Sequence, residues 1–323
     1  MSNWLGNSIP DVPRLLIPRD RNPEICHNIH ISEPLPLTTE VIMKYAIYTP
    51  NFGDGVDPRT LVDLAKEAES CGWDGFFLWD HMLYSKSQKT KIFDPWVVLA
   101  GIAAVTERIR LGTTVTPVAR RRPWKLARET VSIDRLSNGR LVLGVGLGEP
   151  PDADFSFFGD DTTPRGRAER LDEGLEILAG LWRGKPFAYQ GKHYKLEKVT
   201  FLPTPVQQPR IPVWAGGFWP NQPPYRRAAR WDGVIPLKNG GWIDPQDIEE
   251  IMAFIRPLRK TNAPFDVAVI GSRPSLGKPA EALKKLVELE RAGTTWWLEA
   301  FYLERQSAER FYEHLRQGPP GKG

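Results

Sequence analysis

The stretch from Ile109 to Glu149 constrains the fold of this chain more than any other, because it contains two apolar runs joined by a helical pattern. The first run ends at Pro117, an amphipathic run opens at Pro123, and the second apolar run covers Leu141 to Val145. A strand–helix–strand order is typical of parallel strands covered by helices. Because ligands bind at the carboxyl edge of such sheets, the polar and glycine residues that follow both strands predict a site there.

The same alternation continues from Met43 to the end of the chain. A length of 323 residues suits one large α/β barrel or two ordinary domains. Eight predicted strands in strict alternation with helices favour a closed (β/α)8 TIM barrel over an open doubly wound sheet. A doubly wound sheet would also carry GxGxxG at its first strand–helix turn, where this chain has PNFG. The predicted strands are residues 43–49, 74–80, 109–117, 141–145, 211–215, 233–237, 265–270 and 294–298.

Two segments depart from this alternation. Residues 187–201 alternate apolar and polar side chains around Gly191-Lys192, which predicts a β-hairpin excursion after the fourth helix. Residues 1–42 contain six prolines and no sustained hydrophobic period, so we expect an irregular N-terminal arm. The predicted organisation is therefore this arm, at residues 1–42, followed by one barrel domain at residues 43–323.

Composition and motif content exclude several classes of protein. No run approaches the ~18 apolar residues of a membrane span, and Arg14 and Arg19 interrupt any signal-peptide core, so we expect a cytoplasmic protein. The net charge of +4 is spread along the chain with one dense cluster, Arg120–Arg122, which argues against nucleic-acid binding. Residues 26–30 (CHNIH) contain soft metal ligands but no second cluster accompanies them, so we predict no metal site.

Seven segments of the chain, taken in order, resemble those of bacterial luciferase-like flavin oxidoreductases. Each is weakly specific alone, but seven in register are specific for the superfamily, and together they cover about Met43 to Leu237. The resemblance implies a TIM barrel that binds FMN or the deazaflavin coenzyme F420 at the carboxyl ends of its strands. The segments are MKYAIYTPNFG, AESCGWDGFFLWDH, RIRLGTTVTP, ARETVSIDRLSNGRLVLGVGLG, RAERLDEGLEILAGLW, PVQQPRIPVWAGG and RWDGVIPL.

The resemblance assigns roles to residues that follow the second and third strands. His81 follows Asp80 directly, and in deazaflavin-dependent relatives the histidine of a matching Asp-His pair acts as a base or lies against the cofactor. A histidine at the carboxyl end of a barrel strand suits proton transfer near neutral pH, although a histidine with only a structural hydrogen bond also fits the sequence. Thr114-Val115 matches the place of a non-prolyl cis peptide that supports the flavin ring.

Glu149, at the exit of the fourth strand, is the second predicted catalytic residue. Similar deazaflavin sugar-phosphate dehydrogenases carry a glutamate there as an acid, and a solvated loop is an equal alternative. This chain lacks their Asn-Glu pair soon afterwards, which argues against a sugar-phosphate substrate. Gly216-Gly217 precedes a predicted helix near Pro223 and fits either a flavin phosphate or a turn that needs positive φ. Arg120–Arg122 fits a phosphate, a polyglutamate tail or a solvated loop. The predicted cofactor-binding residues are Asn51, Asp80, His81, Thr114, Val115, Thr116, Gly146, Gly148, Ala215, Gly216 and Gly217.

Three functions remain open on this sequence. The leading one is monooxygenation of a small organic substrate with O2 and reduced FMN, which a separate NAD(P)H flavin reductase would supply. The second is hydride transfer with coenzyme F420, in which His81 deprotonates a substrate hydroxyl and Glu149 protonates the cofactor. The third is flavin binding without turnover. Relatives are commonly dimers, so we expect a homodimer. Aromatic residues near the predicted strand exits predict a pocket for an apolar or planar substrate: Phe52, Tyr84, Trp219, Trp242 and Trp297.

Overall fold

The computed structural model describes residues 43–53, 55–84, 89–272, 277, 279–302 and 307–320. The N-terminal arm expected at residues 1–42, with its Cys-His cluster, lies outside these residues. No helix among them is both long enough and apolar enough to cross a membrane.

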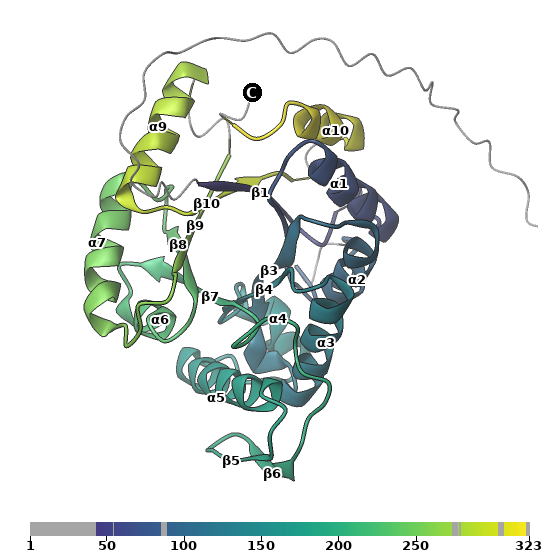
Figure 1. Ribbon diagram of the computed structural model, residues 1–323, viewed down its shortest axis with the longest axis vertical. Coiled ribbons are helices and arrows are strands. Elements are labelled where there is room, and N and C mark those ends of the chain that lie inside the picture. Colours follow the sequence, from purple (N-terminus) through teal and green to yellow (C-terminus); the bar gives the residue numbers. More distant parts are fainter. Residues whose placement is uncertain are drawn as a thin grey trace, which may run out of the picture. The chain divides into compact units, whose positions relative to one another are not determined.

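Eight parallel strands close into a ring in the described part of the chain, in the order β1-β10-β9-β8-β7-β4-β3-β2 (Figure 1). The TIM barrel predicted from the alternation is therefore confirmed. The hairpin β5–β6 after α5 is antiparallel and stands apart from this ring, as predicted. The barrel strands are β1 (Lys44–Thr49), β2 (Gly75–Leu78), β3 (Arg110–Pro117), β4 (Leu141–Gly146), β7 (Val213–Trp219), β8 (Gly233–Lys238), β9 (Asp266–Gly271) and β10 (Trp296–Ala300), and the hairpin strands are β5 (Phe187–Gln190) and β6 (Lys195–Val199).

Helices surround the strands as an outer layer (Figure 1). Three of them begin at Asp-Pro pairs, in which Asp57, Asp94 and Asp244 accept hydrogen bonds from backbone amides of the first turn. Because proline has no N–H to lose and its φ suits a first turn, these pairs define helix starts from sequence alone. The outer helices are α1 (Pro58–Ser70), α2 (Pro95–Val105), α3 (Pro123–Leu136), α5 (Pro164–Trp182), α6 (Gln222–Ala228), α7 (Pro245–Ile255), α9 (Pro279–Ala292) and α10 (Ala308–Arg316), and a short helix α4 (Pro151–Asp154) precedes α5.

Aromatic side chains fill the inside of the barrel below its carboxyl edge. The rings of Phe77 and Trp214 lie 5.3 Å apart, and those of Trp214 and Trp296 lie 5.5 Å apart. All three side chains are buried, and smaller apolar residues such as Ala46 and Ala268 complete this layer. A barrel interior filled in this way leaves room for a ligand only at the mouth.

The fifth barrel strand is longer than the sequence predicts. It was expected to end at Ala215, but β7 continues to Trp219 and carries Gly216 and Gly217 within it. Neither glycine has a positive φ, so the alternative of a turn that needs positive φ is wrong. The glycines serve close packing instead, because a Cβ on Gly217 would lie 2.2 Å from Cβ of Pro224.

A buried arginine joins three elements at the amino-terminal side of β4. The guanidinium of Arg140 is held by five hydrogen bonds, to the carbonyls of Ser137, Ile109, Ala103 and Thr106 and to the Thr106 hydroxyl. Its side chain thereby ties the ends of α2 and α3 to the start of β3. Buried acceptors that lose their donor are costly, so we infer that this contact fixes the relative position of strands three and four.

Replacing Arg140 with methionine should lower the free energy of unfolding by about 3 kcal/mol or more, because several buried acceptors lose their donors. Urea denaturation followed by circular dichroism measures this loss. Arg108→Met, at an exposed arginine that directly precedes Ile109, is the matched control and should change stability by less than about 0.5 kcal/mol. Equal effects of the two substitutions would contradict the role given to Arg140.

Candidate functional site

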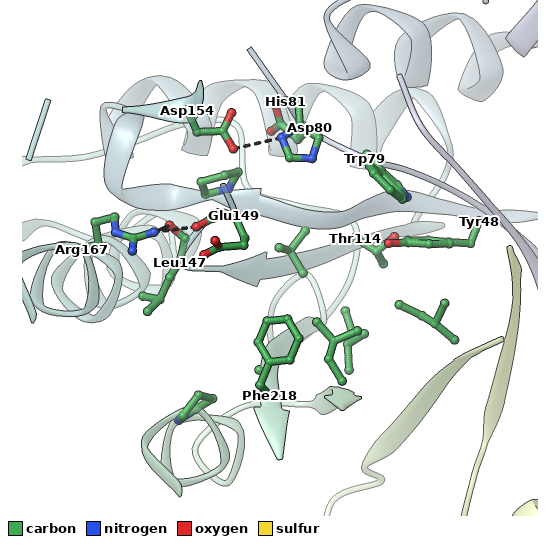
Figure 2. Close-up of a pocket in the computed structure, with 18 of the residues that line it drawn as sticks. Tyr48, Trp79, Asp80, His81, Thr114, Leu147, Glu149, Asp154, Arg167 and Phe218 are labelled. Carbon is green, nitrogen blue, oxygen red and sulfur yellow. Dashed lines mark hydrogen bonds and ion pairs between the residues drawn. The ribbon is translucent and has the colours of Figure 1, made fainter. Parts of the chain in front are cut away.

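A cavity of about 280 Å³ opens at the carboxyl ends of the barrel strands (Figure 2). Its walls come from the exits of β1, β2, β3, β4, β7, β8 and β9, as expected for a ligand site in this fold. One side is mainly apolar and aromatic, whereas the side formed after β2 and β4 carries ionisable groups. The lining residues are Tyr48, Trp79, Asp80, His81, Thr114, Val115, Pro117, Leu147, Gly148, Glu149, Asp154, Arg167, Gly217, Phe218, Asn221, Pro224, Ile235, Leu237 and Ile270.

His81 lies at the mouth, three residues after the end of β2, where it meets a carboxylate from a different loop. Its Nδ1 lies 3.1 Å from Oδ2 of Asp154, the last residue of α4, and the Asp154 side chain is fully buried. Asn51 fixes the His81 backbone with two hydrogen bonds. Its side-chain amide donates to the His81 carbonyl, and its Oδ1 accepts a hydrogen bond from the His81 N–H. Among the described residues nothing is hydrogen-bonded to Nε2 of His81.

Four charged residues behind His81 form a buried ion cluster, which consists of Asp80, Arg120, Arg121 and Asp154. The Arg120 guanidinium donates to both carboxylates and to the Asp80 carbonyl, and Arg121 donates to both oxygens of Asp80 at 2.8 Å. Burial by itself would raise the pKa of Asp80, but the two guanidinium groups outweigh it and hold that pKa below its ordinary value. The solvated loop considered for Arg120 and Arg121 is therefore wrong, because both side chains are mostly buried and paired.

The exit of β4 places a second carboxylate and a cation at the cavity. Glu149 is exposed and has no hydrogen bond to any residue that the structure describes. Arg167, on α5, is 4% exposed and donates to the carbonyls of Leu147 and Gly148 rather than to a carboxylate (Figure 2). Gly148 has φ 83°, a conformation that favours glycine and that turns the chain at the cavity wall. Arg167 thus brings positive charge to the same wall as Glu149.

Strand β3 is irregular where it meets the cavity. The peptide bond between Thr114 and Val115 is cis, and the pairing of β3 with β4 shifts between Thr113 and Thr116. The non-prolyl cis peptide predicted at this position is therefore confirmed, while its contact with a flavin stays a prediction. The Thr114 hydroxyl and the Trp79 indole N–H are buried without a hydrogen-bond partner among the described residues, and both residues line the cavity.

These observations fit a planar cofactor with polar edges. Two unsatisfied polar groups in a cavity are costly unless a ligand or water pairs with them. Burial raises the pKa of Tyr48 well above its ordinary value, so its ring stands in the cavity wall as a neutral phenol. A ring system with carbonyl and N–H groups could bind against Thr114 and Trp79, and its anionic part could lie near Arg167.

Seven of the predicted site residues line the cavity and five do not. Asp80, His81, Thr114, Val115, Gly148, Glu149 and Gly217 are in its wall. Among the others, Asn51 and Thr116 are buried and act through neighbours, since the Thr116 hydroxyl donates to Asp80. Gly146 and Gly216 pack against Val115, and a Cβ on either glycine would come too close to its side chain. Ala215 belongs to the hydrophobic core between the strands and the helices.

Sequence reasoning missed several residues of the site. Asp154 sits in a Pro- and Asp-rich segment that reads as solvated loop, and its only signal was an apolar neighbour on each side. Arg167 lies in an amphipathic helix where arginine is ordinary. The aromatic pocket was placed at partly wrong residues: Phe52 and Tyr84 pack beside His81, Trp219 packs against Tyr225, and Trp242 and Trp297 line a separate cavity of about 250 Å³.

A family model described as a luciferase-like monooxygenase matches residues 43–319, and the chain belongs to this family. An F420-dependent glucose-6-phosphate dehydrogenase of Microbacterium testaceum is 30% identical over 188 residues, which are 57% of this chain and 53% of that protein. The F420-dependent tetrahydromethanopterin reductase of Methanopyrus kandleri superposes with a TM-score of 0.67 at 18% identity, over 85% of this chain and 98% of that one.

A flavin enzyme has the same fold. The oxygenating constituent of 3,6-diketocamphane monooxygenase from Pseudomonas putida, in complex with FMN, has a TM-score of 0.65 at 15% identity, over 85% of this chain and 96% of that one. The predicted resemblance is thereby confirmed. Members of the family are flavin- or F420-dependent oxidoreductases and monooxygenases, and this chain is an enzyme of that class.

Asp80→Asn should destabilise the protein by about 3 kcal/mol at pH 7, because it leaves two buried guanidinium groups with one carboxylate fewer. The folded-state pKa of Asp80 is lowered, so its stabilisation is complete above the ordinary aspartate pKa of about 4 and is lost as the pH falls through the lower folded value. The stability difference between the two proteins should therefore shrink below about pH 4.

Urea denaturation at a series of pH values measures this difference. Asp63→Asn, at an exposed position on α1, serves as control and should leave stability nearly unchanged at every pH. A difference for Asp80→Asn that stays constant from neutral to acidic pH would argue against an ionised Asp80 in the cluster.

Proposed function

We propose that this member of the luciferase-like family is an oxidoreductase that uses coenzyme F420 to transfer a hydride to or from a small organic substrate. The observation that supports it best is that His81 and Glu149 line one cavity, while neither His81 Nε2 nor the Glu149 carboxylate has a hydrogen bond to the described residues. A dehydrogenation of an alcohol releases one proton with each hydride, so it needs groups that accept and donate protons. An acid–base pair at one cavity suits that need.

The residues of the cavity wall have different roles in this proposal. The Thr114 hydroxyl and the Trp79 N–H would bind polar edges of the cofactor ring, and Arg167 would attract its anionic part. When bound, the deazaflavin supplies the two-electron acceptor or donor for the hydride. During oxidation His81 Nε2 would take the proton of the substrate hydroxyl, the hydride would leave the substrate carbon for the cofactor, and Glu149 would give the cofactor the proton that accompanies its reduction. The apolar wall around Tyr48, Leu237 and Ile270 excludes water.

Monooxygenation with FMN is the second candidate, and the apolar wall favours it. Chemistry with O2 on a reduced flavin needs a cavity that excludes water more than it needs an acid–base pair. That function would require a separate NAD(P)H flavin reductase. The FMN-bound solved structure of the same fold is consistent with it. A homodimer stays a prediction for either function, and both would act on a small organic substrate.

Fluorescence titration with F420 and with FMN separates these candidates. We expect F420 to bind with a dissociation constant of about 1 μM or below, because the unsatisfied Thr114 and Trp79 groups gain partners. Thr114→Val should weaken the binding by about threefold to tenfold, which is the effect of one neutral hydrogen bond. Tight binding of FMN with oxygen uptake by the reduced complex would overturn the F420 proposal. If neither cofactor binds at micromolar concentration, both candidates fail.

His81→Gln should lower kcat/KM for F420-linked alcohol oxidation by about 10²-fold or more, because general base catalysis is lost. Glu149→Gln should reduce kcat to a smaller extent and abolish one limb of the pH–rate profile. Glu197→Gln, at an exposed glutamate of the β5–β6 hairpin outside the barrel, is the matched control and should retain full activity. Unchanged turnover in the His81 variant would remove His81 from the mechanism.

A further inference from the structure

We propose that Asp154 is a positioning residue that determines which ring nitrogen of His81 carries the proton. In the neutral ring the proton would be on Nδ1, and the lone pair of Nε2 would be available to the cavity. The catalytic consequence rests on the proposed function, whereas the tautomer itself is a property of the folded chain. The two can therefore fail separately.

The contacts of the Asp154 carboxylate require this tautomer. Its Oδ1 accepts hydrogen bonds from the Met82 N–H at 3.1 Å and from Arg120, and its Oδ2 faces Nδ1 of His81 at 3.1 Å. A carboxylate that is paired with a guanidinium is ionised and can only accept hydrogen bonds. The hydrogen between Oδ2 and Nδ1 must then belong to His81. In a neutral imidazole the other nitrogen is unprotonated and acts as the acceptor.

The ring cannot escape this contact by turning over. The rings of Phe52, Trp79 and Tyr84 surround the imidazole edge to face, with centroid distances of 5.8, 5.6 and 6.0 Å. Asn51 fixes the His81 backbone on both its N–H and its carbonyl. A flip of the ring would also place a C–H against the buried carboxylate and leave Oδ2 without a donor, at a cost of about 1–3 kcal/mol.

Asp154 in turn is fixed by the buried ion cluster. Arg120 joins its carboxylate to Asp80, the residue that precedes His81 in the chain. The Arg120 guanidinium therefore binds Asp154 and also the residue next to His81. It links two segments that are distant in sequence, since Asp154 belongs to α4 and His81 follows β2. Both residues line the cavity, where the Asp154 side chain is fully buried and the His81 side chain is 12% exposed.

This arrangement gives His81 the protonation state that a base needs. In the transfer step the O–H bond of a substrate hydroxyl breaks and an N–H bond forms at Nε2, which leaves the imidazole ring cationic. Asp154, already ionised beside Nδ1, lies where it would stabilise that positive charge. The opposite tautomer would present an N–H to the cavity and could not accept the proton. Asp154 would thus act through His81, because its carboxylate oxygens are already occupied by His81, Met82 and Arg120.

The tautomer can be measured without cofactor or substrate by ¹⁵N NMR of histidine-labelled protein at about pH 9, where a histidine ring is neutral. The His81→Gln spectrum identifies the His81 signals among those of the five histidines. We expect the hydrogen-bearing nitrogen of His81 to be Nδ1. A hydrogen on Nε2 in the wild-type protein would overturn the proposal, whatever the activity of the enzyme.

Asp154→Asn provides the second arm, because its amide can donate a hydrogen bond to Nδ1. We expect the hydrogen of His81 to move to Nε2 in this variant, and kcat/KM to fall by about 10²-fold or more with a smaller change in cofactor affinity. Asp152→Asn is the matched control on the same short helix, where the exposed carboxylate bonds only to Ser156 among the described residues. It should keep the wild-type tautomer and rate.

The outcomes separate the two levels of the proposal. A shifted tautomer with unchanged turnover would overturn the role of Asp154 in catalysis. An Nδ1–H tautomer that persists in a folded Asp154→Asn protein would overturn the assignment of Asp154 as its cause. Should that variant fail to fold, the wild-type spectrum still decides the tautomer. Absence of any F420-linked activity in the wild-type protein would count against the proposed function, while the NMR result would stand.

Discussion

The shape of this site depends on one interaction, the buried pairing of two aspartates with two arginines. Asp80 follows β2, Arg120 and Arg121 follow β3, and Asp154 ends α4 after β4, so the buried ion cluster joins three consecutive strand exits. Its formal charges sum to zero, which makes burial tolerable. Loss of one member would leave an uncompensated charge away from water, and this costs more than the loss of an exposed pair. The cluster therefore fixes the segments that follow β2, β3 and β4 relative to one another.

Below this cluster the barrel supplies the second constraint. The aromatic layer of Phe77, Trp214 and Trp296 closes the interior, so that a ligand reaches only the mouth. The irregular pairing at Thr113–Thr116 then turns β3 into the wall of the cavity. Two buried polar groups, on Thr114 and Trp79, remain without partners among the described residues. The barrel thus supplies the aromatic layer below the cavity and the β3 wall, and the buried ion cluster positions the ionisable groups at the cavity mouth.

The sequence predicts the fold well and the site in part, for a physical reason. Alternation of apolar strands and amphipathic helices is a local pattern, and parallel strands with these short connections have few closed solutions, so the barrel and its hairpin could be predicted. His81 and Glu149 could be predicted because they directly follow strands. Asp154 could not, because its role comes from a contact 73 residues away in sequence. The arginine run looked solvated for the same reason, since its carboxylate partners are distant in the chain.

One loop supplies two carboxylates to the site, and their surroundings give them different capacities. Glu149 is exposed and unpaired among the described residues, so it can exchange protons with solvent and with a bound ligand. Asp154, five positions later, is buried against Arg120 and is confined to accepting hydrogen bonds. Burial and ion pairing alone thus give two carboxylates different chemical roles. Because α4 carries the buried carboxylate and begins two residues after Glu149, any displacement of this loop would disturb the orientation of His81 and the position of Glu149 together.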